Sequence, residues 1–575
     1  YFMREPGTLT FILYNNLNNI SPYRSQPRIV DTQFLNHKFY SLFHLIRYND
    51  KHTLIQQAKQ ILGSDLTDDE KFELLLSKHS ERGHGLYQAF LYSYTELLAE
   101  YIPLILDSSL TKQQKVDLLS AKHSTDDEDG IIPGLYGVLK DEHLEIAEVY
   151  INLIVNTNQL EGQQIKELLQ PKDSLGNSGL YFTFQNGDIS IICFYTKTIL
   201  SSSKLTSTDK VELLAAKNKS GDCGLYIAFQ NGQANIVSSF TEQVINCDKL
   251  TEEEKLELLL AKNASGGYGL SAAFPHAPNH EVILQYTSIV LSSDKISDEL
   301  KVKLLIARYS NGDTGLGLAL ELDLTEKVQG FVDQVLKSNL SDAHKVEILS
   351  PKDAVGHSAL GNVLVSNSDI NQATREFANL IAQSDLSFER KAKLLAANLT
   401  TDDGRCLPII YIATLIENVD LLNKYISLVG SIDALNPQQK LTLILVAEYS
   451  SLYRAVEYEK SSIAIIIIAE LLKLKFSIAV IHKYMCFNNY NGLLVAIDKD
   501  PNFLDNLNNF LKKNQLQAEE LLKKLYSLAN EYIKQDHSYD KSYVIEYLGY
   551  KDIETFKQQI IKALQKLESY IVIND

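Results

Sequence analysis

Apolar residues recur at helical spacing in a segment that returns many times along the chain. In its clearest copy, Leu225, Ala228 and Phe229 stand at positions i, i+3 and i+4, which predicts the buried face of a short first helix. Asn231-Gly232 then predicts a break in that helix. The spacing resumes as a second helix, whose predicted buried positions are Ile236, Val237, Phe240, Val244 and Ile245.

A third helix is predicted to begin after Thr251, because Thr251 and Glu254 can form a capping box with the free amides of the first turn. Its predicted apolar positions are Leu256, Leu258, Leu259 and Leu260. Similar start signals are Thr67 with Glu70, Thr111 with Gln114, and Asn436 before Pro437. A polar turn that ends at Gly266 leads into the next copy.

The copies follow one another along most of the chain. The equivalents of Leu225 lie 41 to 49 residues apart, and they are Phe43, Leu86, Leu135, Leu180, Leu225, Leu270, Leu316, Leu360, Ile409, Leu452 and Leu493. The pattern predicts an all-α fold, an α-solenoid of about eleven helical repeats of roughly 45 residues. Degenerate terminal repeats are expected, because the ends of such an array must cap it.

The start of each unit resembles the ankyrin repeat. The positions that fall on the ankyrin frame are Gly221, Cys223, Gly224, Leu225, Tyr226, Ala228, Gly232, Ile236 and Val237. The chain departs from that frame because Gly replaces the ankyrin Pro, and a tyrosine (Tyr87, Tyr136, Tyr181 and Tyr226) replaces its His. About a dozen extra residues, the third helix, stand where the ankyrin hairpin finger would be. The resemblance implies protein–protein recognition and no chemistry. Three helices per unit also resemble armadillo arrays, which is the alternative architecture.

Three regions are expected. Residues 1–36 form an N-terminal arm, linker or cap, or the tail of an upstream domain; residues 37–515 form the solenoid. Residues 516–575 form a helical C-terminal cap or a small helical domain, with helices at Gln517–Ile533 and Ile553–Val572. The run Ile463–Ile468 is too short to span a membrane, so we expect a buried second helix there.

Charge and cysteine content narrow the possible partners. The chain has 55 basic and 72 acidic residues, a net charge of −17. This balance argues against general binding to a phosphate backbone, so no nucleic-acid partner is expected. Five cysteines occur without a Cys-x-x-Cys pair, which fits a reducing compartment and no disulfide framework.

Two units carry insertions in the turn before the first helix. Insertions in repeat arrays map to loops on one face, often the binding face. The candidate partner-contact residues are the acidic side chains of these two turns, Asp126, Asp127, Glu128 and Asp129 in one and Asp402 and Asp403 in the other. The first turn lacks the alternating ligand spacing of a calcium loop, so no metal is expected there.

Other residue pairs also offer little for catalysis. His276 and His280 have a metal-like spacing, but Pro278 between them argues against presentation from a helix. Cys486 and His482 are four residues apart on one predicted helix, where a buried thiol beside a histidine is the expected arrangement. The tyrosine that follows Gly-Leu in each unit is expected to fill the groove between units, with its hydroxyl on a backbone partner. We therefore expect no catalytic residues, no cofactor and no metal.

The expected function is a non-catalytic, monomeric scaffold that binds a protein. A composition rich in Lys, Asn, Ile and Tyr resembles that of secreted effectors of intracellular bacteria, which act in the cytoplasm of a host cell. The alternative is the substrate-recruiting arm of an enzyme whose catalytic domain precedes Tyr1. A further possibility is that residues 516–575 bind a partner or a membrane.

Overall fold

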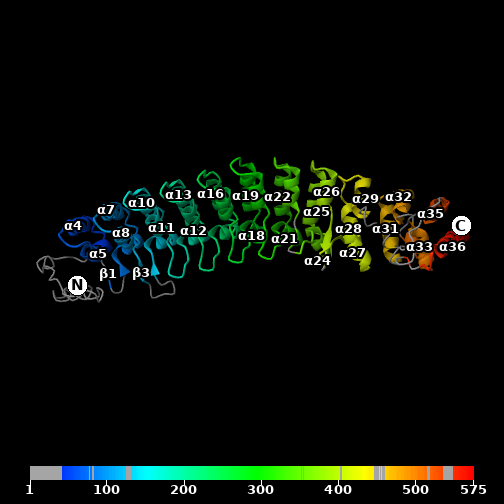
Figure 1. The fold of residues 1–575 in the computed structure, drawn as a ribbon, viewed down its shortest axis with the longest axis horizontal. Helices are drawn as coiled ribbons and strands as arrows, with labels where there is room; N and C mark the ends of the chain where they lie inside the picture. Colours follow the sequence, from blue (N-terminus) through cyan, green and yellow to red (C-terminus); the bar gives the residue numbers. More distant parts are fainter. Residues whose placement is uncertain are drawn as a thin grey trace. The chain divides into compact units, whose positions relative to one another are not determined.

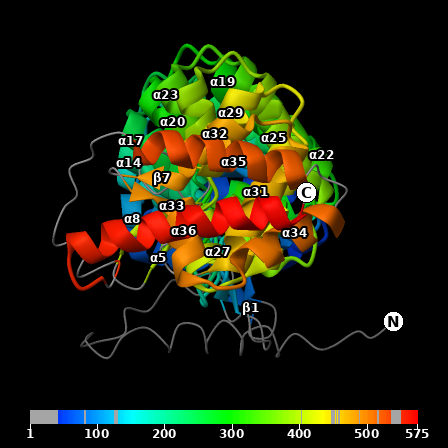
Figure 2. The ribbon, with the colours of Figure 1, turned by 90° about the vertical axis from the view of Figure 1, so that its right-hand side faces the viewer.

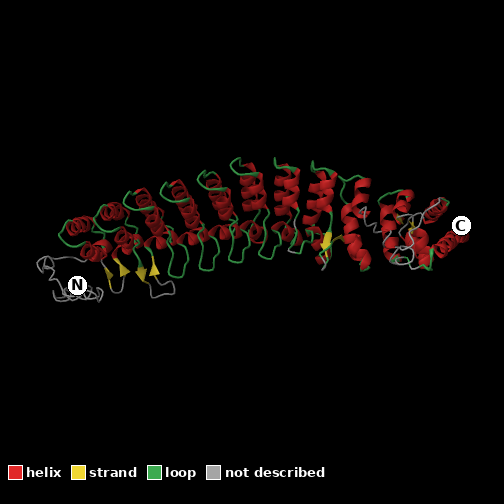
Figure 3. Ribbon diagram, in the orientation of Figure 1, coloured by secondary structure: helices red, strands yellow, loops and turns green. Residues whose placement is uncertain are grey.

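The computed structural model describes most of the chain from residue 42 to residue 574. The residues within that span that lie outside the description are 77, 80–82, 125–130, 351, 354, 402–403, 446–451, 453–454, 456–459, 488–489, 514–517, 535–547 and 549. The chain divides into two compact units between His123 and Ser124. Helices dominate both units, and strands are limited to short pairs (Figure 3).

The first unit is built from two similar sets of three helices. They are α3 (Leu42–Arg47), α4 (Lys51–Leu62) and α5 (Asp68–Leu76), then α6 (Gly85–Leu91), α7 (Thr95–Leu106) and α8 (Lys112–Leu119). Each helix of the first set packs against its counterpart in the second: α3 on α6, α4 on α7 and α5 on α8. The antiparallel pair β1 (Lys78–His79) and β2 (Gly83–His84) stands between the two sets.

The second unit continues the same order of helices. The short first helices are α9 (Gly134–Lys140), α12 (Gly179–Asn186), α15 (Gly224–Gln230), α18 (Gly269–His276), α21 (Gly315–Glu321), α24 (Ala359–Ser366) and α27 (Ile409–Leu415). The second helices are α10 (Leu144–Asn156), α13 (Ile189–Ser201), α16 (Ala234–Ile245), α19 (Glu281–Ser292), α22 (Thr325–Lys337), α25 (Gln372–Gln383) and α28 (Val419–Gly430). The third helices are α11 (Gly162–Leu169), α14 (Ser207–Leu214), α17 (Glu252–Leu259), α20 (Asp298–Leu305), α23 (Asp342–Leu349), α26 (Phe388–Leu395) and α29 (Pro437–Leu445).

Packing in the second unit follows a period of three helices. From α9 to α24 each first helix contacts the next first helix, and from α10 to α25 each second helix contacts the next second helix. The third helices do the same from α11 to α29. Figure 1 shows the second helices α10, α13, α16, α19 and α22 side by side. The architecture is therefore all-helical and repeat-like, as the sequence pattern predicts.

The end of the chain keeps this order in part. The remaining helices are α31 (Ser461–Lys473), α32 (Ile478–Met485), α33 (Gly492–Lys499), α34 (Phe503–Lys513), α35 (Ala518–Ile533) and α36 (Ile553–Asn574). Helix α36 packs on both α33 and α35, and Figure 2 shows α35 and α36 side by side. The two predicted C-terminal helices are confirmed, and the run Ile463–Ile468 is buried inside α31 as predicted.

The predicted helix starts are confirmed by their hydrogen bonds. Thr111 and Thr251 form capping boxes with Gln114 and Glu254. In the first unit, the amide of Thr67 donates to a carboxylate oxygen of its predicted partner, Glu70, at 2.8 Å. Pro437 is the first residue of α29. These signals are local, so the sequence alone is sufficient to find them.

Two of the predicted repeat anchors are wrong by one residue. In most units the turn after the first helix has a residue with positive φ seven positions beyond the anchor, such as Ser93 after Leu86 and Asp323 after Leu316. By this criterion the anchors are Leu42 and Ile410, because Asn49 and Glu417 have positive φ. Phe43 and Ile409 are not the anchors. The glycine that precedes the anchor in most other units is absent in both of these units, so apolar residues alone gave the wrong register.

The predicted core of the third helix is also partly wrong. Leu258 and Leu259 are buried, but Leu256 and Leu260 are only half-buried, and Lys255 is buried at 5 % exposure. The Lys255 Nζ donates to the carbonyl of Ile245, at the end of α16, at 2.7 Å. A cation at a helix C-terminus is stabilised by the free carbonyls and the helix dipole. Two other third helices repeat the contact, from Lys391 to Ala382 at 2.8 Å and from Lys440 to Gly430 at 2.7 Å.

The second helices carry buried tyrosines that bond to the preceding third helix. The Tyr195 hydroxyl donates to the carbonyl of Leu169 at 2.6 Å, and the Tyr286 hydroxyl donates to the carbonyl of Leu259 at 3.2 Å. Burial raises the pKa of both phenols well above the usual value. Phe240 occupies the same position in α16 and is buried. The ring is therefore the common packing element, and the hydroxyl adds a directional bond where it is present.

In four units the glycine at the start of the first helix lies against the preceding first helix, at Gly179, Gly224, Gly269 and Gly315. A Cβ added at Gly224 would come within 2.6 Å of Cδ2 of Phe184, which is fully buried. Such a distance is too short for two carbon atoms, so the glycine allows α12 and α15 to approach. This contact explains why Gly-Leu recurs so strongly in the sequence.

We predict that Gly224→Ala destabilises the second unit by about 1–3 kcal/mol, because the added methyl overpacks the contact with Phe184. Urea unfolding followed by circular dichroism measures the change. The control is the double variant with Phe184→Leu, which removes the ring atom that the methyl meets. The interpretation is wrong if the two costs simply add, because residues in contact are expected to couple.

We predict that Tyr195→Phe costs about 1–2 kcal/mol at pH 8, because the carbonyl of Leu169 loses its buried donor. Since the folded pKa of Tyr195 is raised, its stabilising contribution is lost as the pH rises through the unfolded value of about 10. The gap between variant and parent should therefore shrink above pH 10, which urea unfolding at pH 8 and pH 10.5 would show. Tyr92→Phe, at an exposed position, should leave both values unchanged; a gap that stays constant with pH would contradict the assignment.

Candidate protein-contact surface

The turn between a third helix and the next first helix is a short hairpin. Antiparallel bridges join Lys172 to Ser178, Lys217 to Cys223, Arg308 to Thr314 and Lys352 to Ser358. A longer pair, β5 (Asn398–Thr400) with β6 (Cys406–Pro408), stands before α27. The remaining strands are β3 (His123–Ser124), β4 (Ile131–Ile132), β7 (Cys486–Phe487) and β8 (Tyr490–Asn491). The expectation that the third helix replaces the ankyrin hairpin is wrong, because each of these units has both.

An Asp or Asn near the start of the hairpin fixes its shape. In one hairpin an oxygen of Asp173 accepts from the amides of Leu175 and Asn177, at 3.0 and 2.8 Å. Asp353 accepts from the amide of His357 at 2.8 Å in the same way. Burial favours the neutral acid of Asp353, but hydrogen bonds from Asn362 and from backbone amides outweigh it and lower the pKa. These carboxylates serve the turn, since their oxygens are already used.

Neighbouring hairpins are joined by backbone hydrogen bonds. The amide of Ser178 donates to the carbonyl of Lys217 at 3.0 Å, and the amide of Cys223 donates to that of Lys262 at 3.2 Å. The amide of Tyr268 then donates to the carbonyl of Arg308 at 2.9 Å. The hairpins from residue 172 to residue 314 therefore form one continuous hydrogen-bonded row, which follows one edge of the second unit in Figure 1.

The tyrosines of the first helices contact this row from the side of the helices. The hydroxyl of Tyr136 donates to Oδ2 of Asp173 at 3.2 Å, and Tyr181 shares a hydrogen bond with Asn218. Both rings are buried, at 1 % and 8 % exposure, which supports the packing role. For these two tyrosines the hydroxyl bonds to a hairpin side chain, whereas a backbone partner was expected.

The predicted acidic contact residues lie outside the described part of the chain. This holds for Asp126, Asp127, Glu128 and Asp129, and for Asp402 and Asp403. The second of the two insertions has described ends, where Thr401 donates its amide to the carbonyl of Arg405 at 2.9 Å. The role of these acidic side chains in binding stays a prediction.

The histidine pair has no metal-like surroundings in the described residues. Nδ1 of His280 lies 3.3 Å from a carboxylate oxygen of Glu326, and Pro275 lies inside the helix that ends at His276. Across the part of the chain that the structure describes, no three His, Cys, Asp or Glu side chains gather as a metal site. All five cysteines are free thiols.

Cys486 and His482 are neighbours, but the pKa values of both side chains are shifted in the direction that disfavours a thiolate–imidazolium pair. Sγ of Cys486 lies 4.0 Å from Nε2 of His482, and Nδ2 of Asn491 lies 3.1 Å from the same nitrogen. Burial lowers the pKa of His482 to about 4 and raises the pKa of Cys486 to about 12. Near neutral pH both groups are uncharged, and a reactive thiolate requires the opposite shifts.

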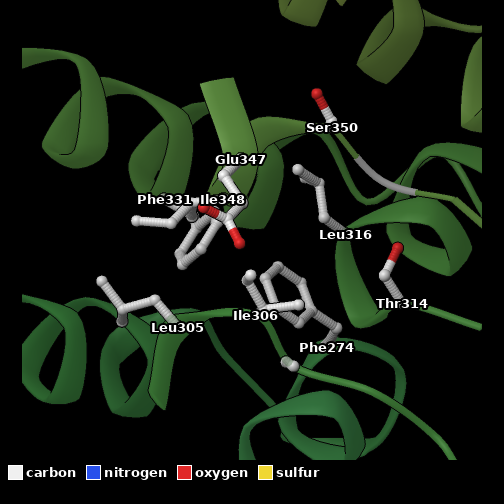
Figure 4. Close-up of a pocket in the computed structure, with 10 residues that line it drawn as sticks. Phe274, Leu305, Ile306, Thr314, Leu316, Phe331, Glu347, Ile348 and Ser350 are labelled. Atoms are coloured by element: carbon white, nitrogen blue, oxygen red, sulfur yellow. The ribbon is translucent and has the colours of Figure 1, made fainter. Parts of the chain in front are cut away.

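Two hollows of the second unit differ in size and character. A small hollow of about 10 Å³ lies among Phe274, Leu316, Phe331 and Ile348, and Figure 4 shows Thr314, Glu347 and Ser350 around it. Its volume is enough for roughly one water molecule. An open groove of about 310 Å³ runs past the starts of α13, α16 and α19, lined by residues that include Gln233 and Glu281. Neither is an enclosed apolar pocket of the size that small-molecule sites have.

Two comparisons of the chain with known proteins found no match. No model of a known protein family matches it, and no curated protein matches it significantly. None of the described helices has both the length and the apolar character needed to cross a membrane. The proposed function is therefore based on the geometry of the hairpin row.

One set of residues on this surface is missing from the sequence-based prediction. Each hairpin from residue 172 to residue 358 begins with a basic residue, and these are Lys172, Lys217, Lys262, Arg308 and Lys352. Their spacing of 44 to 46 residues equals that of the repeat. The regular spacing of these basic residues is visible in the sequence. One lysine per unit is nevertheless typical of an ordinary exposed charge, and only the structure shows that the hairpins lie side by side.

We predict that the parent protein loses about 2 kcal/mol of stability between pH 7 and pH 5 because of His482. The unfolded histidine binds a proton below its usual pKa of about 6.5, whereas the buried one does not until about pH 4. His482→Gln removes this term, so the difference in urea unfolding between the two pH values should be smaller in the variant. An equal loss in both proteins would show that the histidine is accessible to protons in the folded state.

Proposed function

We propose that the chain is a non-catalytic scaffold for protein recognition, built as an α-solenoid of about eleven ankyrin-like units. One observation carries the proposal: successive hairpins bond to one another through their backbones, from Ser178 to Lys217 and onward. This arrangement exposes hairpin side chains at regular intervals on a fixed support. A regular support of that kind suits recognition of an extended partner.

Preorganisation is the physical advantage of such a surface. Binding is weakened when loops must be ordered on association. Here the Asx hydrogen bonds within each hairpin and the backbone bonds between hairpins hold the turns before any partner arrives. The first-helix tyrosines Tyr136 and Tyr181 add hydrogen bonds to hairpin side chains from the side of the helices. Little ordering cost is left for binding.

The proposed setting is the cytoplasm of a eukaryotic host, with the chain acting as a monomeric bacterial effector. Composition supports this setting: 45 % of residues are hydrophobic, five cysteines are free, and Lys, Asn, Ile and Tyr are frequent. Nucleic acid is not the proposed partner, because a net charge of −17 repels a phosphate backbone. The acidic insertions remain the proposed second contact region.

We predict that the immobilised full chain retains a specific protein from eukaryotic cytosol, identified by mass spectrometry. A loop variant carries Asn at Asp126, Asp127, Asp129, Asp402 and Asp403. It should retain less of that protein if the insertions contribute contacts. A control with the same change in charge carries Asn at the exposed positions Asp141, Asp294, Asp369, Asp385 and Asp433.

The possible outcomes test the scaffold function and the location of the contact surface separately. Loss in the loop variant alone assigns the contact to the insertions. Retention by both variants supports the scaffold and assigns the contact to another surface, such as the hairpin row. If the folded parent retains no specific protein, the scaffold proposal fails for that cytosol.

A further inference from the structure

The hairpin row displays a line of positive charge on an otherwise acidic chain. The basic row is defined by Lys172, Lys217, Lys262, Arg308 and Lys352, which stand at the start of five successive hairpins, and all but Lys262 are bridged residues. The four lysines are exposed, whereas Arg308 is half-buried and donates to the carbonyl of Gly312 at 2.9 Å. In the described part of the chain none of the four lysines forms an ion pair, although Nζ of Lys262 lies over the ring of Tyr268.

The hydrogen bonds fix the spacing of the basic row. Lys172 is bridged to Ser178, whose amide bonds to Lys217, so two strand spacings separate the two lysines. The same links lead from Lys217 to Lys262 and from Lys262 to Arg308. Because neighbouring strands lie about 4.8 Å apart, the basic row advances by roughly 10 Å per hairpin from Lys172 to Arg308.

The row presents its charges on the face opposite to the carboxylates of the hairpins. Asp173 directly follows Lys172 and is 4 % exposed, and successive side chains of an extended strand point to opposite faces. A glutamate precedes each lysine of the row by five residues, on the third helix: Glu167, Glu212, Glu257 and Glu347. The lysines are therefore separate positive charges with negative charges near them in the sequence. They do not form one continuous basic patch.

We propose that the basic row binds an extended acidic polypeptide in the polyproline II conformation, with a carboxylate at every third residue. A polyproline II helix has three residues per turn and rises about 3.1 Å per residue, so every third side chain lies on one side at intervals of about 9 Å. This interval matches the spacing of the row. A β-strand does not match, because its side chains at i and i+3 point to opposite faces.

A peptide fits the row better than a nucleic acid does. Duplex DNA carries one charge per about 1.7 Å of axis, so roughly six phosphate charges would face each basic residue of the row. The neighbouring glutamates would repel such a dense polyanion. A peptide with one carboxylate per step of the row meets one lysine each time and leaves the glutamates uncovered. The inference rests on the proposed scaffold function and names the chemistry of its partner.

The test uses the full chain and three labelled probes in fluorescence anisotropy. The first probe repeats Glu-Pro-Pro, which holds the polyproline II conformation and places a glutamate at every third residue. The second has the same composition and length but places its glutamates in adjacent pairs. The third is a single-stranded RNA of similar length. We expect the evenly spaced peptide to bind about tenfold more tightly than the paired one, and more weakly as salt is raised.

Variants assign the binding to the row. Changing Lys172, Lys217, Lys262 or Lys352 singly to Gln should weaken binding of the evenly spaced peptide by roughly two- to fivefold, and the four changes together by more than tenfold. The matched control changes four exposed lysines on other elements to Gln: Lys197, Lys337, Lys393 and Lys512. It has the same net charge as the quadruple row variant and should bind like the parent. Circular dichroism checks that both remain folded.

Three results would overturn the inference. Equal binding of the two peptides would remove the role of spacing, and an equal loss in the row and control variants would reduce the effect to net charge. Tighter binding of the RNA than of either peptide would exclude the peptide as the preferred ligand class. The scaffold proposal is judged separately: if cytosolic capture by the quadruple row variant is unchanged, the scaffold stands and the basic row is not its contact.

Discussion

Close approach of successive first helices is the constraint on which the second unit depends. Phe184 lies where a side chain on residue 224 would have to be, and only a glycine there lets α12 and α15 meet. Once these helices are in contact, the turns that precede them are held at strand distance. The amide of Ser178 can then reach the carbonyl of Lys217. The hairpin row is thus a consequence of helix packing, with no sheet core of its own.

Buried polar groups complete this packing in a regular way. Lys255 closes the end of α16, and the hydroxyl of Tyr195 reaches the last turn of α11. Each bond satisfies carbonyls at a helix end that would otherwise face an apolar interior, where an unpaired group is costly. Similar helix ends recur along the chain, and several of them are satisfied in the same way, as Lys391, Lys440 and Tyr286 show. This explains how many short helices, some with only two turns, can form a stable stack.

The sequence predicts the local features of the fold well. The helix period, the capping boxes at Thr111 and Thr251 and the C-terminal helices follow from signals within a few residues of each other. The hairpins and the buried Lys255 did not follow, because each depends on atoms that the fold brings from another element. The register at Ile410 was missed because the glycine that precedes the anchor in most other units is absent there. For the contact surface, the sequence analysis predicted the acidic insertions and missed the basic row. The basic row can be recognised only when the distance between neighbouring repeats is known.

The tyrosine bonds give the stack a direction. Each donor ring sits in a second helix, and each acceptor carbonyl belongs to the third helix before it, as Tyr286 and Leu259 show. Removing units from the C-terminal side leaves a bare carbonyl at the new end, which water can hydrate easily. Removing them from the N-terminal side strips the cover from an aromatic side chain as well. The two ends of a shortened array are therefore not equivalent: the new first unit has a second-helix tyrosine without its acceptor, whereas the new last unit has a third-helix carbonyl without its donor.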